Sequence, residues 1–456
     1  MDAFERFSNR HGRSSHRIGL TGALRVLVVT SVVLLTGREA EAIPPFARQT
    51  GLACNACHTA YPQLTPLGRQ FKLGAYQMGS APVYERLGAW MQGSFTRTHA
   101  PQPGGAEAEF GENDNFALDQ VSLFYGGQVY EPIGAFLQGT YDGVGQVWSW
   151  DNYDIRAADQ TEIGGKPVTY GMTVNNSPTA QDILNTTPVW GFPFDGSALA
   201  PSPAAAPVID GGLAQISAGV TAYAVWDNTL YGEVGVYHTL KRRTVEALGA
   251  DSEDIPQSDG IAPYWRYLWM HDSGSQSLAL GTFGLYAPLF PGGDRSAGSD
   301  DFTDVGFDGQ YQYFGDRGSL TLRASLILEF QDLNASHTLG AADRHEGQLN
   351  TFNTSASYTY DQVLTFTAGL RETWGSRDAA YYGTPGGRPD STAETFQLDY
   401  APLHKSPLEV YPWFDPRFTV QYVHYTMFDG RTHDVDGMGR SAADNDTLFV
   451  LSTITF

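Results

Sequence analysis

Hydrophobic and polar side chains alternate along this chain from about residue 86 to its end. In the stretch 319–330, for example, Leu320, Leu322, Ala324, Leu326, Leu328 and Phe330 alternate with Ser319, Thr321, Arg323, Ser325, Ile327 and Glu329. Successive side chains of a β-strand point to opposite faces of the sheet, so a period of two predicts strands with one apolar and one polar face. The charged side chains of this stretch fall on one face only.

Sixteen stretches of this kind predict sixteen strands. We expect them near 86–98, 116–130, 133–143, 150–159, 166–175, 213–226, 229–241, 262–271, 277–288, 302–314, 318–331, 349–360, 363–375, 392–402, 414–428 and 446–456. Brief turns such as Glu131-Pro132 and Asp361-Gln362 alternate with longer loops rich in Gly, Asp, Ser and Pro, near 99–115, 176–212, 242–261, 332–348 and 429–445.

The connection lengths decide between two kinds of β protein. Hydrophobic and polar residues also alternate in the strands of a soluble β-sandwich. Short turns on one side and long loops on the other, however, are typical of bacterial outer-membrane barrels. The chain ends in Phe456, which resembles the terminal aromatic of the outer-membrane assembly signal. We predict an all-β, porin-like transmembrane barrel of sixteen strands over residues 86–456. Weak patterning near 150–159 and 166–175 leaves fourteen strands as an alternative.

The first 42 residues predict a signal peptide. Arginines precede an apolar run over 26–35, and Ala40-Glu41-Ala42 supplies the small residues of a cleavage pattern. The apolar run is about half of the roughly 20 residues that a transmembrane helix needs. We therefore expect export and cleavage after Ala42.

Composition supports this class and excludes nucleic acid as a partner. Hydrophobic residues make up 41% of the chain and aromatic residues 13%, as suits many short amphipathic strands. The net charge is -22, and removing residues 1–42, with six Arg and four acids, changes it by two to -24. Such a chain would repel a polyanion. An acidic surface can also concentrate cations, although acids in loops mostly serve solubility.

The only two cysteines of the chain lie in the motif Cys54-Asn55-Ala56-Cys57-His58. Cys-x-x-Cys-His is the attachment signature of c-type haem, in which two thioethers hold the porphyrin and the histidine ligates the iron. A thioredoxin-like pair would need a preceding strand and a following helix, and a zinc site would need further ligands. We therefore predict one covalently bound haem c, held by Cys54, Cys57 and His58.

The sixth position of the iron has several candidate ligands. Met78 is the only methionine between the motif and the first predicted strand, and a thioether would raise the reduction potential. A packing role explains this methionine equally well. Met91 and His99 are weaker candidates because they fall in or beside the first strand. The position is otherwise open to solvent or substrate.

Residues 43–85 are too few for a large hydrophobic core, so the haem would form the core of this small α-helical cytochrome domain. Leu64, Leu67, Phe71 and Leu73 predict a short amphipathic helix that packs on the porphyrin. A sixteen-stranded barrel encloses a lumen that a domain of this size could plug. The pattern does not choose between a domain inside the lumen and one beneath it.

The haem segment resembles a known family. The resemblance lies in three stretches: Pro45 to His58, Pro62-Gln63-Leu64, and Leu67-Gly68-Arg69-Gln70-Phe71-Lys72. The segment is similar to the fused monohaem cytochrome-porins of iron-oxidising bacteria, whose architecture also comprises a signal peptide, one N-terminal haem motif and a barrel. The resemblance implies an outer-membrane electron conduit that takes electrons from extracellular Fe(II) and passes them to a periplasmic c-type cytochrome.

The resemblance supplies no iron-binding residue. Loop acids could gather the cation because iron ions accept oxygen ligands: Glu107, Glu109, Glu112, Asp114, Asp300, Asp301, Asp434 and Asp436. His337, His345 and His433 lie in predicted long loops as well. The alternatives are electron transfer from another extracellular donor, a solute porin with a structural haem plug, and a soluble periplasmic haem enzyme.

Overall fold

The computed structural model describes residues 44–79, 82–250, 255–404 and 413–456, so the predicted signal peptide lies outside the described residues. Within them, seventeen strands form one antiparallel sheet, and β8 (Gln257–Ser258) has only two residues. The other sixteen strands form the wall. Each pairs with its neighbours, and β1 pairs with β17 and closes the barrel. The predicted strand count is therefore confirmed.

The strands of the wall follow the predicted ranges closely. Their bounds are Leu87–Thr98 (β1), Asn115–Tyr130 (β2), Ile133–Asp142 (β3), Val147–Ile163 (β4), Lys166–Asn175 (β5), Ser217–Trp226 (β6), Leu230–Thr239 (β7), Ala262–Ser273 (β9), Gln276–Phe290 (β10), Asp300–Phe314 (β11), Gly318–Asp332 (β12), Glu346–Tyr360 (β13), Leu364–Gly375 (β14), Ser391–Tyr400 (β15), Asp415–Met427 (β16) and Thr447–Thr455 (β17). The two weakly patterned stretches form β4 and β5 in full, because each pairs with both of its neighbours.

The apolar face of the strands points outward. In β12, Arg323 and Glu329 point inward and are buried, whereas Leu322 and Phe330 on the other face are 42% and 47% exposed. Other strands expose large apolar side chains in the same way: Leu123, Met172, Val220, Val234, Trp269, Leu280, Phe307, Phe366, Phe396 and Val420. A closed barrel with an apolar outer belt lies in the hydrocarbon of a bilayer. The chain is therefore a protein of the bacterial outer membrane, surrounded by its lipid.

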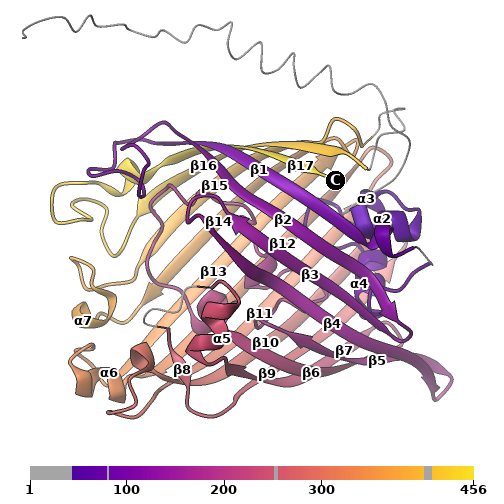
Figure 1. Ribbon diagram of the computed structural model, residues 1–456, viewed down its shortest axis with the longest axis horizontal. Helices are drawn as coiled ribbons and strands as arrows, with labels where there is room; N and C mark the ends of the chain where they lie inside the picture. Colours follow the sequence, from indigo (N-terminus) through magenta and orange to yellow (C-terminus); the bar gives the residue numbers. More distant parts are fainter. Residues whose placement is uncertain (1–43, 80–81, 251–254, 405–412) are drawn as a thin grey trace, which may run out of the picture. The chain divides into compact units, whose positions relative to one another are not determined.

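The two ends of the barrel differ in the length of the connections between strands (Figure 1). At one end, turns of two or three residues join the strands, for example at Glu131-Pro132 between β2 and β3, except for the longer connection 401–414 between β15 and β16. The long connections lie at the other end. The C-terminus and the helices before β1 both lie at the short-turn end, where Phe456 and Ala89 exchange backbone hydrogen bonds of 2.8 and 3.1 Å. Short turns face the periplasm in outer-membrane barrels.

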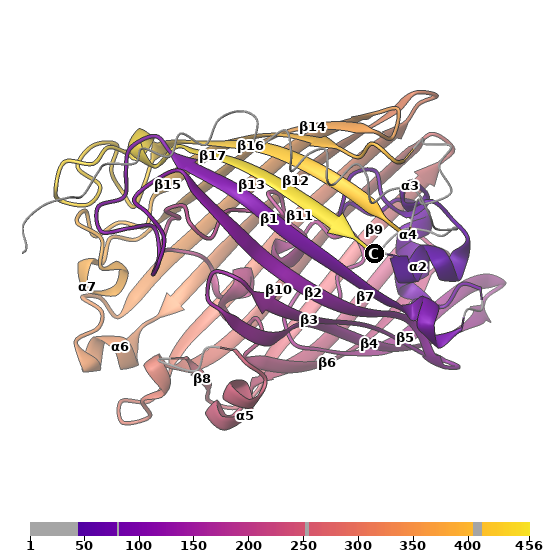
Figure 2. The same ribbon diagram turned by 45° about the horizontal axis from the view of Figure 1, so that its top comes forward.

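Residues 44–79, called the plug below, enter the barrel at its short-turn end (Figure 2). They carry α2 (Pro44–Thr50), α3 (Cys54–Cys57) and α4 (Pro66–Leu73), and η1 (Val83–Arg86) follows them. Side chains of the plug hydrogen-bond to inward-facing residues of β10, β12 and β13, including Ser277, Thr321 and Ser357. The plug therefore lies inside the lumen rather than beneath it.

A second segment, residues 176–216, also folds into the lumen and is called the inserted loop below. It contains η2 (Pro188–Trp190) and η3 (Val208–Gly212). The remaining short helices lie in other connections: α5 (Arg242–Ala247), η4 (Pro291–Gly293), α6 (Asn334–Leu339), α7 (Ala379–Tyr382) and η5 (Ala442–Asn445). None of the described helices is both long enough and apolar enough to cross a bilayer.

Candidate functional site

The two cysteines and the histidine of the motif line one apolar cavity in the plug. Cys54 begins α3, Cys57 ends it, and His58 follows as its C-cap. The rest of the lining is mostly aromatic and aliphatic, and it comes from the plug, β3 and the inserted loop: Phe46, Leu52, Leu64, Phe71, Tyr76, Phe136 and Trp190. An apolar cavity with convergent polar groups is the usual form of a cofactor site.

Helix α4 holds the motif in place. Thr65 is its N-cap and accepts a hydrogen bond from Gly68 N, while the Thr65 hydroxyl donates to Ala56 O at 2.6 Å. The backbone N–H of Thr65 donates to Cys57 O at 2.9 Å. A Cβ atom on Gly68 would lie 2.4 Å from Cys57 O, so only glycine lets α4 pack this closely on the motif.

Burial sets the protonation of the motif. It lowers the pKa of His58 to about 4 and raises the pKa of the Cys57 thiol to about 11. The imidazole is therefore neutral at pH 7, as a metal ligand must be. Its Nδ1 atom is buried and has no hydrogen-bond partner among the described residues. A half-buried, neutral histidine beside two thiols has the residue types that haem c requires.

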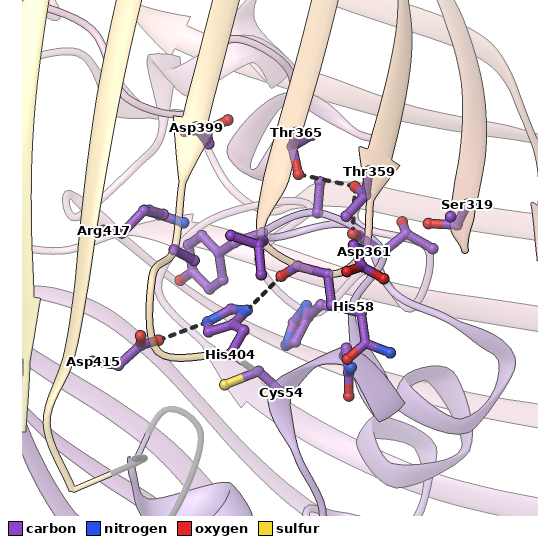
Figure 3. A pocket seen from close by; sticks show the side chains of 18 of the residues that line it. Cys54, His58, Ser319, Thr359, Asp361, Thr365, Asp399, His404, Asp415 and Arg417 are labelled. Atoms are coloured by element: carbon purple, nitrogen blue, oxygen red, sulfur yellow. Dashed lines mark hydrogen bonds and ion pairs between the residues drawn. The ribbon is translucent and has the colours of Figure 1, made fainter. Parts of the chain in front are cut away.

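A second cavity, of about 340 Å³, adjoins the first across Cys54, His58 and Tyr61, which line both. Figure 3 shows it at the end of the barrel where β13 and β14 are joined. The first cavity alone holds about 90 Å³ of free space, so a porphyrin attached to the motif would extend into this second space. The residues present therefore fit a haem group.

His404 and Asp415 are the part of this site that sequence reasoning missed. His404 Nε2 lies 3.0 Å from Asp415 Oδ2, and its Nδ1 lies 3.0 Å from Gln362 O. The Cys54 sulfur and one ligand atom each of His404 and Asp415 lie within 4.8 Å of one another (Figure 3). These three atoms could hold a metal ion only if Cys54 carried no thioether. The unusually long turn after β15 is the one signal that could have drawn attention to them.

The structure does not bring the predicted sixth ligand to the cavity lining. Met78 packs against an aromatic cluster formed by Phe71, Tyr76, Trp90, Phe124, Phe136 and Trp190, and its role as a ligand stays a prediction. Met91 points out of the barrel in β1 and is 41% exposed, and His99 follows the far end of β1. Neither residue lines a cavity that the motif lines.

Three polar side chains anchor the plug in the lumen. The ammonium group of Lys72 donates to Ala180 O, Asp182 O and Asn185 Oδ1, all in the inserted loop, at 3.0, 2.7 and 3.1 Å. Arg69 pairs with Asp272 at 2.6 Å, and the Tyr76 hydroxyl donates to Asp154. Burial, with the nearby charge of Arg156, lowers the pKa of Lys72 to about 7.

Each of three aspartates of the inserted loop pairs with an arginine of the wall. Asp182 lies 3.1 Å from Arg266, Asp195 lies 3.5 Å from Arg417, and Asp210 lies 2.6 Å from Arg371. Backbone N–H groups of Val208 and Ile209 donate to Glu329 and Asp304. The loop is thus bound to the wall along its length. Its length and composition predicted a long loop but not its inward path.

The predicted cation-gathering acids do not form one cluster. Asp300 is buried and accepts hydrogen bonds from the backbone of Ala335 and Ser336, so it holds α6 in place. Asp434 pairs with Arg431 at 3.1 Å, and Asp436 accepts from two backbone N–H groups of its own turn. Glu107, Glu109 and Glu112 are exposed. His337 and His345 stack with ring centroids 3.8 Å apart, and His433 lies 3.2 Å from Ser441.

Comparison with known proteins gives similarity of fold only. No family model matches the chain, and no curated protein matches it. Among solved structures, the outer-membrane protein OmpT of Vibrio cholerae in its trimer form is 8% identical, with 81% of this chain and 98% of that chain covered and a TM-score of 0.44. An anion-selective porin of Comamonas acidovorans is 12% identical, with 81% and 98% covered and a TM-score of 0.43. The outer-membrane channel DcaP of Acinetobacter baumannii is 10% identical, with 81% and 96% covered and a TM-score of 0.43.

Proposed function

We propose that this barrel is an outer-membrane electron conduit whose plug carries one covalently bound haem c. The observation that supports the proposal most directly is the shared apolar cavity of Cys54, Cys57 and His58, inside a plug at the periplasmic end of a membrane barrel. At this end of the barrel the motif faces the periplasm. An exported chain is delivered to the periplasm, and haem c is attached there. A purely structural plug needs neither the paired thiols nor a half-buried, neutral histidine beside them.

The roles of the residues follow from their chemistry. Cys54 and Cys57 would hold the porphyrin through thioether bonds, and His58 would supply a ring nitrogen as a ligand of the iron. Bound haem would supply a one-electron couple. Phe46, Phe71 and Trp190 would keep water from one side of it, which tunes the reduction potential. If the thioether of Met78 is the sixth ligand, replacing Met78 with leucine lowers that potential.

The donor and the acceptor belong to opposite sides of the membrane. The resemblance to cytochrome-porins supports extracellular Fe(II) as the substrate, which loses one electron and is left outside as Fe(III). A periplasmic c-type cytochrome gains that electron. Short-turn residues such as Asp316, Asp361 and Gln362 line the second cavity beside Cys54, so a carrier approaching from the periplasm would meet the motif there.

A solute porin with a structural haem plug is the second candidate. A cavity of about 370 Å³ between the inserted loop and β12–β17, with a lining of polar and apolar residues, favours it, because open space remains in the lumen beside the plug. Electron transfer requires the haem iron to change its oxidation state, whereas solute passage does not.

Rapid mixing of the purified, full-length protein with Fe(II) in detergent, without oxygen, separates these functions. We expect the haem absorbance to change to that of the reduced state on the time scale that rapid mixing resolves. In a Cys54→Ser, Cys57→Ser double variant no thioether can form, so any pigment that it binds should be extractable by acidified solvent, whereas a Met438→Leu control, changed at an exposed loop residue, should behave as the wild type.

Two results would contradict the proposal. A wild-type protein without bound pigment from cells that attach haem c would remove the cofactor. A haem that neither Fe(II) nor a dye of lower potential reduces would favour the structural plug, whereas reduction by the dye alone would point to another donor.

A further inference from the structure

A cavity of about 370 Å³ lies in the lumen, apart from the haem motif. The inserted loop lines one side of it, from Thr186 to Ala206, and inward-facing residues of β12 to β17 line the other. None of Cys54, Cys57 and His58 belongs to this lining. The volume matches that of a small-molecule site.

The charge of this cavity is opposite to that of the chain. Its charged lining residues, within the part of the chain that the structure describes, are Arg323 and Arg371, and no acid lines it. The whole chain carries a net charge of -22. A cavity lined by two cations in such an acidic protein attracts an anion and disfavours a free cation.

Arg323 has no counter-ion in the described structure. Its side chain is buried, with the residue only 7% exposed, and its Nη2 atom has no hydrogen-bond partner among the described residues. The carboxylates of Asp182 and Asp308 act on it electrostatically, but both already pair with Arg266. Arg371, by contrast, pairs with Asp210 at 2.6 Å.

A buried guanidinium without a partner is costly, since it has lost its water and gained no acceptor. Polar groups beside it complete a recognition surface. Ser325, Ser355 and Thr395 line the same cavity with hydroxyls that can donate to an anion.

We propose that Arg323 is the centre of a binding site for a small oxyanion, most simply the carboxylate of an organic acid. The planar guanidinium matches a carboxylate through two parallel hydrogen bonds, and neighbouring hydroxyls bind the remaining lone pairs. The site does not depend on haem, because its lining excludes the motif. It gives the lumen an affinity for anions that the overall charge of the chain would not suggest.

Calorimetric titration of the full-length protein in detergent tests the site, with succinate and inorganic phosphate as probes. We expect saturable binding of at least one probe and about ten- to hundredfold weaker binding by Arg323→Gln, as for the loss of a charge-assisted hydrogen bond. Arg242→Gln, which removes an exposed cation from α5, should bind as the wild type does. No saturable binding by the wild type, or equal binding by Arg323→Gln, overturns the proposal.

Thermal unfolding gives an independent reading that does not require the probes to be the right anions. If Arg323 serves a ligand, Arg323→Met should leave the melting temperature of the ligand-free protein unchanged or raise it, because an unpaired buried charge is replaced by an apolar chain of similar length. If Arg323 instead supports the fold, the melting temperature falls and the proposal fails.

Discussion

Single buried arginines determine how the lumen of this barrel is filled. Arg266 in β9 is fully buried and bonds Asp308 through both terminal nitrogens, at 2.6 and 2.8 Å, while its Nε lies 3.1 Å from Asp182. The first acid belongs to the wall and the second to the inserted loop. One guanidinium therefore pairs with two carboxylates that would otherwise repel each other. Exposed ion pairs such as Lys166–Asp227 do not join the inserted loop to the wall in this way.

Replacing Arg266 with methionine should destabilise the barrel by about 3–5 kcal/mol, because Asp182 and Asp308 are left buried without a cation. Urea unfolding followed by tryptophan fluorescence measures this change. The matched control is Lys166→Met, which breaks a solvent-exposed pair and should cost less than about 1 kcal/mol. Equal effects of the two substitutions would mean that the loop does not depend on this pair.

The contact between plug and wall is specified by small residues of the strands. Gly134 of β3 faces Ala75, and a Cβ atom at this position would lie 1.7 Å from Ala75 O. The plug backbone thus fits directly against the wall where a side chain is missing. Lys72 and Arg69 then bind the plug to the inserted loop and to Asp272. Removal of either kind of contact should loosen the plug while the barrel stays closed.

Gly134→Val should displace the plug and make its buried basic residues accessible to protease. Overpacking costs about 1–3 kcal/mol, which corresponds to an increase of about tenfold in trypsin cleavage after Arg69. Mass spectrometry of the fragments measures the rate. Gly139→Ala in the same strand, where a Cβ atom would meet nothing closer than 4.0 Å, is the control. Unchanged cleavage in Gly134→Val would show that the plug is not held at this point.

The molecule as a whole combines an apolar outer belt with a lumen filled by its own chain. Sixteen strands would enclose a water-filled channel in an open porin. Here the plug occupies the periplasmic end, and the inserted loop crosses the interior beside it. This arrangement fills much of the lumen and leaves a cavity along one part of the wall. The proposed electron conduit would need no wider channel than this.

Planar-bilayer recordings should therefore give a conductance well below that of an open sixteen-stranded porin. Gly134→Val should raise it several-fold by displacing the plug, since the barrel wall itself is not altered. The Gly139→Ala variant should conduct as the wild type does. A wild-type conductance equal to that of an open porin would instead favour the solute-porin alternative.

The barrel could be predicted from the order of residues alone because its signal is local. Period-two alternation, as in β12, and the difference between short turns and long loops need no knowledge of distant contacts. The motif of Cys54, Cys57 and His58 is also a local signal, because its residues lie within five positions of the chain, and its haem stays a prediction. The position of the plug, the inward path of residues 176–216 and the partners His404 and Asp415 depend on contacts between residues far apart in the chain. Arg323 shows the same limit, since alternation predicts that it faces the lumen, while only the folded structure decides which arginines are left without an acid.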